Sequence, residues 1–323
     1  MQRFTVILII STLAFITSTR IPESDLVVYI NNFQVAKDIS FFEYIFFQAK
    51  DPFFNLITFI LANLDLESYQ YVFTLSFLFY FLIFKIVETF NITSDIKMMF
   101  FLSLCFNPII FSLHIHLLRQ FIGLVFFIYS ITLVNKKYKI LFKLMAVLSH
   151  FSFIVLLAFM RIVSNLRDLL IVVSLIILIF LYKDNLVSVP ILGYLIARSS
   201  GQYLDFDTPS IGSLAFGFLM FIFIFYNLSY ENKLLNKEFK FFIWAVLSLF
   251  LVSFFFSSEL FYRTFPIIVI ISHFIFLEFS IKIKFPEGLN FKTMLIWFPL
   301  NIILFILFLK SLFIGQWKYS LFV

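Results

Sequence analysis

The sequence predicts an all-α bundle of membrane-spanning helices, and three observations carry this prediction. Hydrophobic residues make up 62% of the 323-residue chain and charged residues only 13%, whereas soluble domains are about 45–50% apolar and about 25% charged. The mean hydropathy is +1.05. Apolar residues also gather in runs close to the roughly 20 residues that a helix needs to cross a bilayer. We therefore expect residues 1–323 to form a single integral membrane domain.

The apolar runs give the expected elements in chain order. Nine are read as spans, namely 3–19, 68–88, 97–112, 117–134, 168–182, 211–229, 240–256, 262–281 and 293–313. A shorter run, 52–64, is opened by Pro52, whose missing N–H is harmless at a helix start, so we expect a re-entrant or interfacial helix there. The runs 138–163 and 186–199 are ambiguous, which leaves about 9–11 membrane segments.

Lysine and arginine residues set the expected orientation, because they concentrate in short cytoplasmic loops. The strongest cluster, which we place in the cytoplasm, comprises Lys136, Lys137, Lys139 and Lys143. By parity the N-terminus is then cytoplasmic. The acidic segment 20–51 and the turn that contains Arg119 fall on the outer side.

The run 138–163 admits three arrangements. If it crosses once, the basic residues of the later loops fall outside, against the rule. If it enters and returns, they fall inside and His150 lies near the outer face, and we favour this arrangement. In the third, 186–199 crosses instead and His150 lies deeper.

Ionisable residues inside apolar runs need an explanation, because a charge at the centre of a spanning helix costs about 2.5–3.5 kcal/mol. Arg119 and Gln120 open a span, and Arg119 either binds phosphate or carboxylate or serves as an interfacial anchor. His150, beside Ser152, is either a general base, given its ordinary pKa of about 6.5, or a structural group. Arg263 opens a later span at the outer level, where it either pairs with Glu259 or takes part in the site.

Several other site classes are excluded. His114 and His116 are spaced i, i+2, which does not place both on one helix face, and no metal-ligand pattern accompanies them, so we expect no metal and no cofactor. The single Cys105 cannot form a disulfide within the chain. No GxGxxG, P-loop or GxSxG motif is present. The basic residues are short topology signals, so we expect no nucleic-acid partner.

The order of these features resembles the EpsG-like branch of Wzy-type polymerases of O-antigen and exopolysaccharide. An outer loop with Asp25 and Tyr29 comes first, and the most specific element is Arg119-Gln120 followed some thirty residues later by His150-x-Ser152. The remaining features are Asp51-Pro52-Phe53-Phe54, Ser68-Tyr69-Gln70, Asn107-Pro108, the lysine-rich turn and Arg263. In one departure, Gly123 stands where small residues such as Ala are expected.

The resemblance implies a GT-C-like bundle in the inner (cytoplasmic) membrane. Such an enzyme joins oligosaccharide repeat units carried on undecaprenyl diphosphate at the outer face, in capsule, exopolysaccharide or O-antigen biosynthesis. A chain-length regulator is an expected partner beside the lipid bilayer. Arg119 and Arg263 would stabilise the diphosphate and His150 would act as base, with Asp25 as alternative base or sugar ligand. Tyr29, Gln120 and Ser152 are the further expected substrate-binding residues.

Two other functions remain open. One is a flippase or transporter of lipid-linked oligosaccharide, which would also need outward-facing cationic residues. Transporters commonly show repeated halves and broken, charged helices at the midplane, and no such repeat is seen by eye. The other is a polytopic O-antigen ligase or acyltransferase, which would share the His and Arg chemistry.

Overall fold

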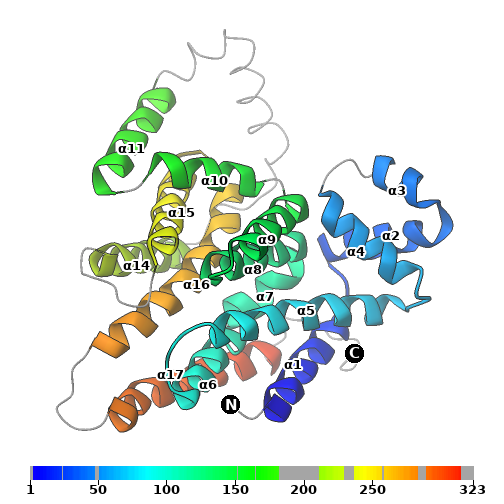
Figure 1. Cartoon of the computed structure of the whole chain (residues 1–323), viewed down its shortest axis with the longest axis horizontal. Coiled ribbons are helices and arrows are strands. Elements are labelled where there is room, and N and C mark those ends of the chain that lie inside the picture. Colours follow the sequence, from blue (N-terminus) through cyan, green and yellow to red (C-terminus); the bar gives the residue numbers. More distant parts are fainter. Residues whose placement is uncertain are drawn as a thin grey trace. The chain divides into compact units, whose positions relative to one another are not determined.

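The computed structural model describes residues 3–23, 25–47, 51–150, 152–163, 165–181, 211–228, 236–256, 258–282 and 289–313. Within these ranges the chain is helical and forms no extended strand (Figure 1). It divides into two compact units, the first formed by Met1–Ile154 and Phe279–Val323, the second by Val155–Glu278. Each unit contains expected spans, so the single membrane domain stays a prediction.

The first unit carries most of the features of interest. Its helices are α1 (Arg3–Ser18), α2 (Asp25–Asp38), α3 (Phe41–Phe47), α4 (Pro52–Ala62), α5 (Ser68–Glu88), α6 (Ser94–Cys105), α7 (Pro108–His116), α8 (Leu118–Thr132), α9 (Lys136–Ser149) and α17 (Leu289–Phe313). Asn301 of α17 donates a hydrogen bond to the Met99 carbonyl of α6, at 3.0 Å. Phe111 of α7 meets Phe308 of α17 edge to face, with ring centroids 4.8 Å apart. These contacts fix the returning C-terminal helix against α6 and α7.

The second unit is built around α15 (Lys237–Phe256). Its other helices are α10 (Ser152–Ile162), which begins at the unit boundary, α11 (Leu166–Leu181), α14 (Ile211–Leu228) and α16 (Ser258–Lys282). Trp244 of α15 packs edge to face on Phe225 of α14, with centroids 6.0 Å apart. Phe239 packs on Phe274 of α16 at 5.2 Å. Aromatic packing therefore joins three of the helices of this unit.

Helix α5 coincides with the predicted span 68–88. Its 21 residues extend about 31 Å at 1.5 Å per residue, which matches the roughly 30 Å hydrocarbon core of a bilayer. Among the described residues it is the one helix that is long and apolar enough to cross a membrane, and seven shorter apolar helices accompany it.

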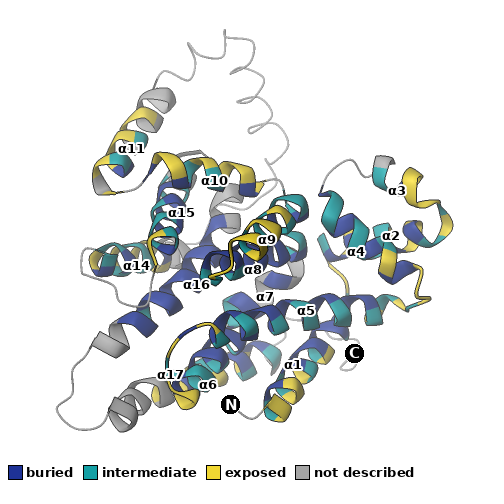
Figure 2. Cartoon of the chain, viewed as in Figure 1, coloured by how far each residue is buried: buried dark blue, intermediate teal, exposed yellow. Residues whose placement is uncertain are grey.

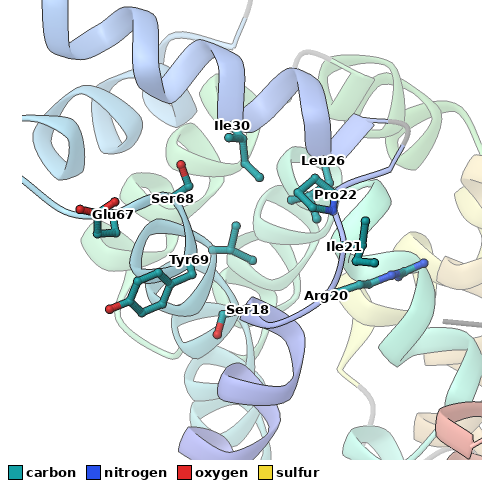
Figure 3. A pocket seen from close by; sticks show the side chains of 10 residues that line it. Ser18, Arg20, Ile21, Pro22, Leu26, Ile30, Glu67, Ser68 and Tyr69 are labelled. Carbon is teal, nitrogen blue, oxygen red and sulfur yellow. The ribbon is translucent and has the colours of Figure 1, made fainter. Parts of the chain in front are cut away.

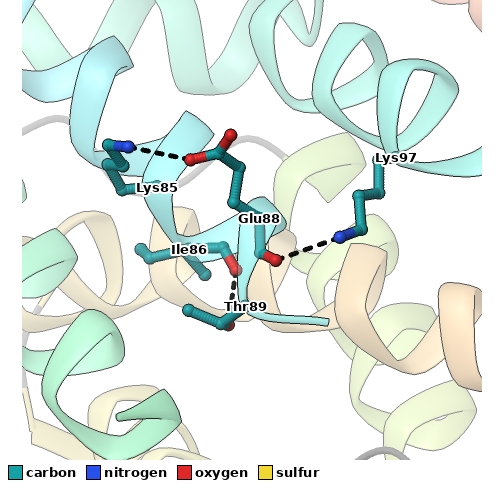
Figure 4. Close-up of polar contacts among 5 residues, drawn as sticks. All are labelled: Lys85, Ile86, Glu88, Thr89 and Lys97. Atoms are coloured by element: carbon teal, nitrogen blue, oxygen red, sulfur yellow. Dashed lines mark hydrogen bonds and ion pairs between the residues drawn. The ribbon is translucent and has the colours of Figure 1, made fainter. Parts of the chain in front are cut away.

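The C-terminal end of α5 carries a cluster of polar contacts (Figure 4). Lys85 pairs with Glu88 at 2.8 Å, and Lys97 donates to the Glu88 carbonyl at 3.0 Å. A cation at this end satisfies a carbonyl that lacks an intrahelical partner and complements the helix dipole. Both lysines therefore have structural roles at the end of the helix.

Large apolar side chains are exposed on the outer faces of helices in both units (Figure 2). On α17, Ile303 is 55% and Ile306 is 57% exposed, and on α1 Phe4 is 80% exposed. Soluble monomers rarely expose so many large apolar side chains, whereas lipid tails can cover them. The chain is a helical membrane protein.

One predicted span was wrong. The run 97–112 is not one helix, because α6 ends at Cys105 and α7 begins at Pro108. Proline cannot donate the hydrogen bond that would continue the helix. Asn107 instead accepts from the backbone N–H groups of Ile109 and Ile110, at 2.9 and 3.2 Å, and so starts a new helix.

The ambiguous run 138–163 is also divided. Helices α9 and α10 meet at His150 and contain 14 and 11 residues, about 21 and 16 Å long. Neither reaches across a bilayer core of roughly 30 Å. The run is therefore not one continuous spanning helix, and the segment 186–199 lies outside the described residues.

Candidate functional site

Several helix ends of the first unit meet at one place. Helices α1 and α5 pack together, and Ser18 at the end of α1 lines the same cavity as Ser68 at the start of α5. The two helices therefore run antiparallel. The acidic segment between them, expected as a loop, forms α2 and α3 and packs over these ends. Phe33 of α2 stacks on Tyr71 of α5, with ring centroids 4.4 Å apart.

Arg119, at the start of α8, is the centre of a polar cluster at this end. Its Nη1 atom donates to Oδ2 of Asp51 at 2.8 Å, and the side chains are 33% and 7% exposed. Its guanidinium carbon lies 5.4 Å from the centre of the Tyr29 ring, and Asp25 also interacts with it electrostatically. An arginine held by a carboxylate and a ring face keeps one orientation while part of it reaches solvent.

The backbone of Asp51 explains how its carboxylate reaches Arg119. Asp51 has φ 56° and ψ 57°, in the left-handed region, and its side chain makes no capping bond to α4. Asp and Asn occupy this region more readily than other side chains, although it still carries strain. The residue gives up the usual N-cap bond, and its carboxylate binds the arginine instead.

A second layer of buried hydroxyl groups lies behind the ion pair. The Thr58 hydroxyl of α4 donates to the Phe54 carbonyl at 3.1 Å and contacts the Tyr71 hydroxyl at 3.0 Å. The Tyr44 hydroxyl of α3 is enclosed and makes no hydrogen bond of good geometry within the described chain, although Thr58 is nearby. Burial raises the pKa of Tyr44 to about 12, so it remains a neutral phenol.

Helices α8 and α9 bring His150 to the level of Arg119. They are joined by three residues, 133–135, and pack along their length, so they run antiparallel. A Cβ atom on Gly123 of α8 would lie 3.2 Å from the Ala146 carbonyl of α9. Arg119 precedes Gly123 by four residues, and His150 follows Ala146 by four. Four residues extend about 6 Å along a helix axis. Because the two helices are antiparallel, both segments extend in the same direction, so Arg119 and His150 lie at the same level.

His150 occupies the break between α9 and α10. Its backbone N–H bonds to the Ala146 carbonyl at 3.1 Å, and its own carbonyl accepts from Phe153 at 3.1 Å. The ring Nδ1 accepts from the backbone N–H of Ser152 at 3.4 Å. With Nδ1 as acceptor, the neutral ring carries its hydrogen on Nε2. In that tautomer Nε2 donates a hydrogen bond, whereas in the other tautomer Nε2 can accept a proton as a base.

The structure places the other predicted site residues unevenly. Asp25 and Tyr29 share the cluster with Arg119, Gln120 is buried beside it in sequence, and the Ser152 side chain is exposed. Arg263 belongs to α16 in the second unit, and its side chain lies outside the described residues. Among the residues that the structure describes, no three His, Cys, Asp or Glu side chains gather as metal ligands.

The sequence reading did not include Asp51 or Tyr44 among the site residues. Asp51 directly precedes a helix-opening proline, a pattern that predicts an N-cap and not an ion pair. Its partner is 68 positions away, which no local pattern reveals. Tyr44 is one of 14 tyrosines in a chain that also has 53 phenylalanines, so nothing in the sequence distinguishes it.

A model of the EpsG family matches residues 3–321, nearly the whole chain. No curated protein matches the chain, and no solved structure matches it.

Proposed function

Because this chain belongs to the EpsG family of polysaccharide-biosynthesis membrane proteins, we propose that it joins oligosaccharide repeat units carried on undecaprenyl diphosphate. The reaction takes place at the outer face of the cytoplasmic membrane, with the N-terminus inside, and the bundle is of the GT-C-like kind. The observation that carries this proposal is the polar cluster around Arg119 at one end of the first unit. Arg119 is held there by Asp51 and Tyr29, level with His150.

The chemistry needs a fixed positive charge. A hydroxyl oxygen of the acceptor glycan forms a bond to the anomeric carbon of the donor, and the bond from that carbon to the diphosphate oxygen breaks. The leaving undecaprenyl diphosphate takes the bonding electrons, so negative charge grows on its oxygens. Donors placed beforehand in a site with little water stabilise such charge most effectively. We propose Arg119 as this donor, because Asp51 and Tyr29 fix its orientation, and Arg263 as a second donor.

The proton of the attacking hydroxyl needs an acceptor. His150 is expected in this role in the tautomer that carries its hydrogen on Nδ1, whereas in the tautomer whose Nδ1 accepts from Ser152 we propose that Nε2–H donates to sugar or diphosphate oxygens. Asp51 is buried and committed to Arg119. Asp25 is half-buried beside the same guanidinium, and we assign it the role of base. Tyr29, Gln120 and Ser152 remain proposed substrate ligands, and a chain-length regulator a proposed partner.

Flippase and ligase functions predict a different cellular product. A cell that lacks the polymerase still transfers single repeat units to the final acceptor, whereas a cell that lacks a flippase or ligase transfers none. Deletion of this gene, followed by electrophoresis of the surface glycan, separates these functions. We expect acceptors that carry one repeat unit each. Acceptors without any repeat unit would contradict the proposal.

A further inference from the structure

A cavity of about 300 Å³ lies between the start of α2 and the start of α5 (Figure 3). Glu67, Ser68 and Tyr69 line one side at the start of α5, and Pro22 and Leu26 line the opposite side. Ser18, Arg20, Ile21, Ile30 and Val72 complete the lining. Pockets of small organic ligands begin near this volume and combine apolar walls with a few polar groups.

The composition of the walls selects the class of ligand. The polar groups at the start of α5 are one carboxylate and two hydroxyl groups, and the Arg20 side chain extends away from them (Figure 3), so a carboxylate without a facing cation disfavours a phosphate on this side. Hydroxyl groups of Ser18, Ser68 and Tyr69 beside aliphatic walls match a ligand with hydroxyl edges and apolar faces, as a sugar ring has. Tyr69 is 55% exposed, so its ring offers an amphipathic surface to an incoming ligand.

The walls are held in place without a ligand. Gln34 of α2 donates to the Ser68 hydroxyl at 2.7 Å, and Lys37 of α2 donates to the Leu66 carbonyl at 2.7 Å. Gln70 accepts from the backbone N–H of Glu67 at 2.9 Å and so closes the first turn of α5. Binding therefore does not require the walls to be ordered first, which lowers the entropic cost of binding.

Helix α2 connects the cavity to the proposed reaction centre. Asp25 and Tyr29 are spaced i, i+4 on the stripe that contacts Arg119. Leu26 and Ile30 have the same spacing on the next stripe, about 100° around the helix, and line the cavity. A glycan bound at Arg119 by its lipid diphosphate therefore has a second contact surface within one helix width.

We propose that this cavity binds one sugar of the repeat-unit glycan, with Tyr69 as its stacking surface and Glu67 and Ser68 as its polar contacts. This inference rests on the proposed polymerase function, and it adds a glycan-specificity site separate from the diphosphate site.

The test uses the purified full-length protein in nanodiscs and saturation-transfer NMR. The probe is the free repeat-unit oligosaccharide, released by mild acid from the producing cell's own glycan lipid. We expect saturation transfer to the oligosaccharide from the wild-type protein and from Tyr69→Phe, and a loss of about tenfold in affinity for Tyr69→Ala. The matched control is Tyr138→Ala, because Tyr138 is equally exposed at 56% but lies near the start of α9, at the opposite end from His150. This control should bind as the wild type does.

Two outcomes would overturn the inference. One is equal affinity of Tyr69→Ala and wild type for the oligosaccharide. The other is displacement of the oligosaccharide by a sugar-free prenyl diphosphate in the Arg119→Ala background, which would show that the cavity takes the lipid. A wild-type protein that binds the oligosaccharide through Tyr69 but makes no polymer supports the cavity and refutes the polymerase function, so the two failures are distinguishable.

Discussion

Gly123→Ala is the substitution that tests the packing beneath the site most sharply. The new Cβ would lie 2.7 Å from Cε2 and 3.1 Å from Cδ2 of Phe153, and 3.2 Å from the Ala146 carbonyl oxygen. Phe153 is 2% exposed and stacks on Phe127, with centroids 5.6 Å apart, so its ring has little freedom to move aside. The Ala146 carbonyl is part of the α9 backbone, so it has even less freedom to move.

The expected free-energy change combines two opposing terms. Overpacking in a tight core costs about 1–3 kcal/mol, whereas replacing glycine by alanine inside a helix gains about 1 kcal/mol. We therefore expect the free energy of unfolding to fall by about 1 kcal/mol. Because Phe153 bonds to the His150 carbonyl at 3.1 Å, its displacement also moves the turn, and polymer formation should fall more than stability does.

A double-mutant cycle provides the measurement and its control. Unfolding in mixed detergent micelles is followed by circular dichroism for Gly123→Ala, Phe153→Leu and the double variant. Leucine removes the ring edge that meets the new methyl group, so the double variant should recover about 1 kcal/mol relative to the sum of the single changes. A Gly123→Ala protein that is more stable than wild type, with no coupling to Phe153, would refute the close approach of α8 and α9.

Two further predictions concern the hydroxyl layer and His150. Tyr71→Phe should lower the free energy of unfolding by about 0.5–1.5 kcal/mol, because it removes the hydrogen bond to Thr58. Tyr44→Phe removes an enclosed hydroxyl without a good hydrogen bond, so the free energy of unfolding should stay unchanged or rise. Equal losses in both variants would contradict these hydrogen-bond assignments. If the Nε2–H group of His150 is a donor, His150→Ala should lower the polymerisation rate about 10²–10³-fold. His150→Gln keeps an N–H donor, so it should retain most of the rate, with little change between pH 6 and 8. Wild-type rates for His150→Ala over that range would reduce His150 to a packing residue, and equal loss in both variants would restore its role as a base.

The helical membrane class and most of the helices could be predicted from the sequence. Composition excludes a soluble fold, and the run 68–88 became α5 with the same ends because a long apolar helix is determined locally. The prediction of one helix over 97–112 was wrong. It rested on the apolar character of the run, although Pro108 indicates a helix break. Helix α2 was missed although its buried residues Leu26, Tyr29 and Phe33 follow helical spacing. A polar, acidic segment between spans is typical of a loop, and this typical reading is wrong here.

The site could be predicted only in part. Arg119 and His150 stand out in the sequence, because an ionisable group within an apolar run needs a structural or functional explanation. The register of α8 and α9 in the structure then places them at one level. The partner Asp51 depends on a left-handed backbone and on a contact between distant positions. Gly123 was noted as a departure from the resemblance, and only the approach of Phe153 and Ala146 shows why a larger residue does not fit. Such contacts arise from packing and leave no local pattern.

The measurement that tests the central claim most directly is polymer length made by Arg119→Lys protein reconstituted with lipid-linked repeat units. Lysine keeps the charge but loses the planar donors that pair with Asp51 and with phosphate. We predict normal membrane insertion, intact binding of the free oligosaccharide and a polymerisation rate lowered about 10²–10³-fold. Polymer of wild-type length at the wild-type rate would contradict the assignment of Arg119 to the diphosphate.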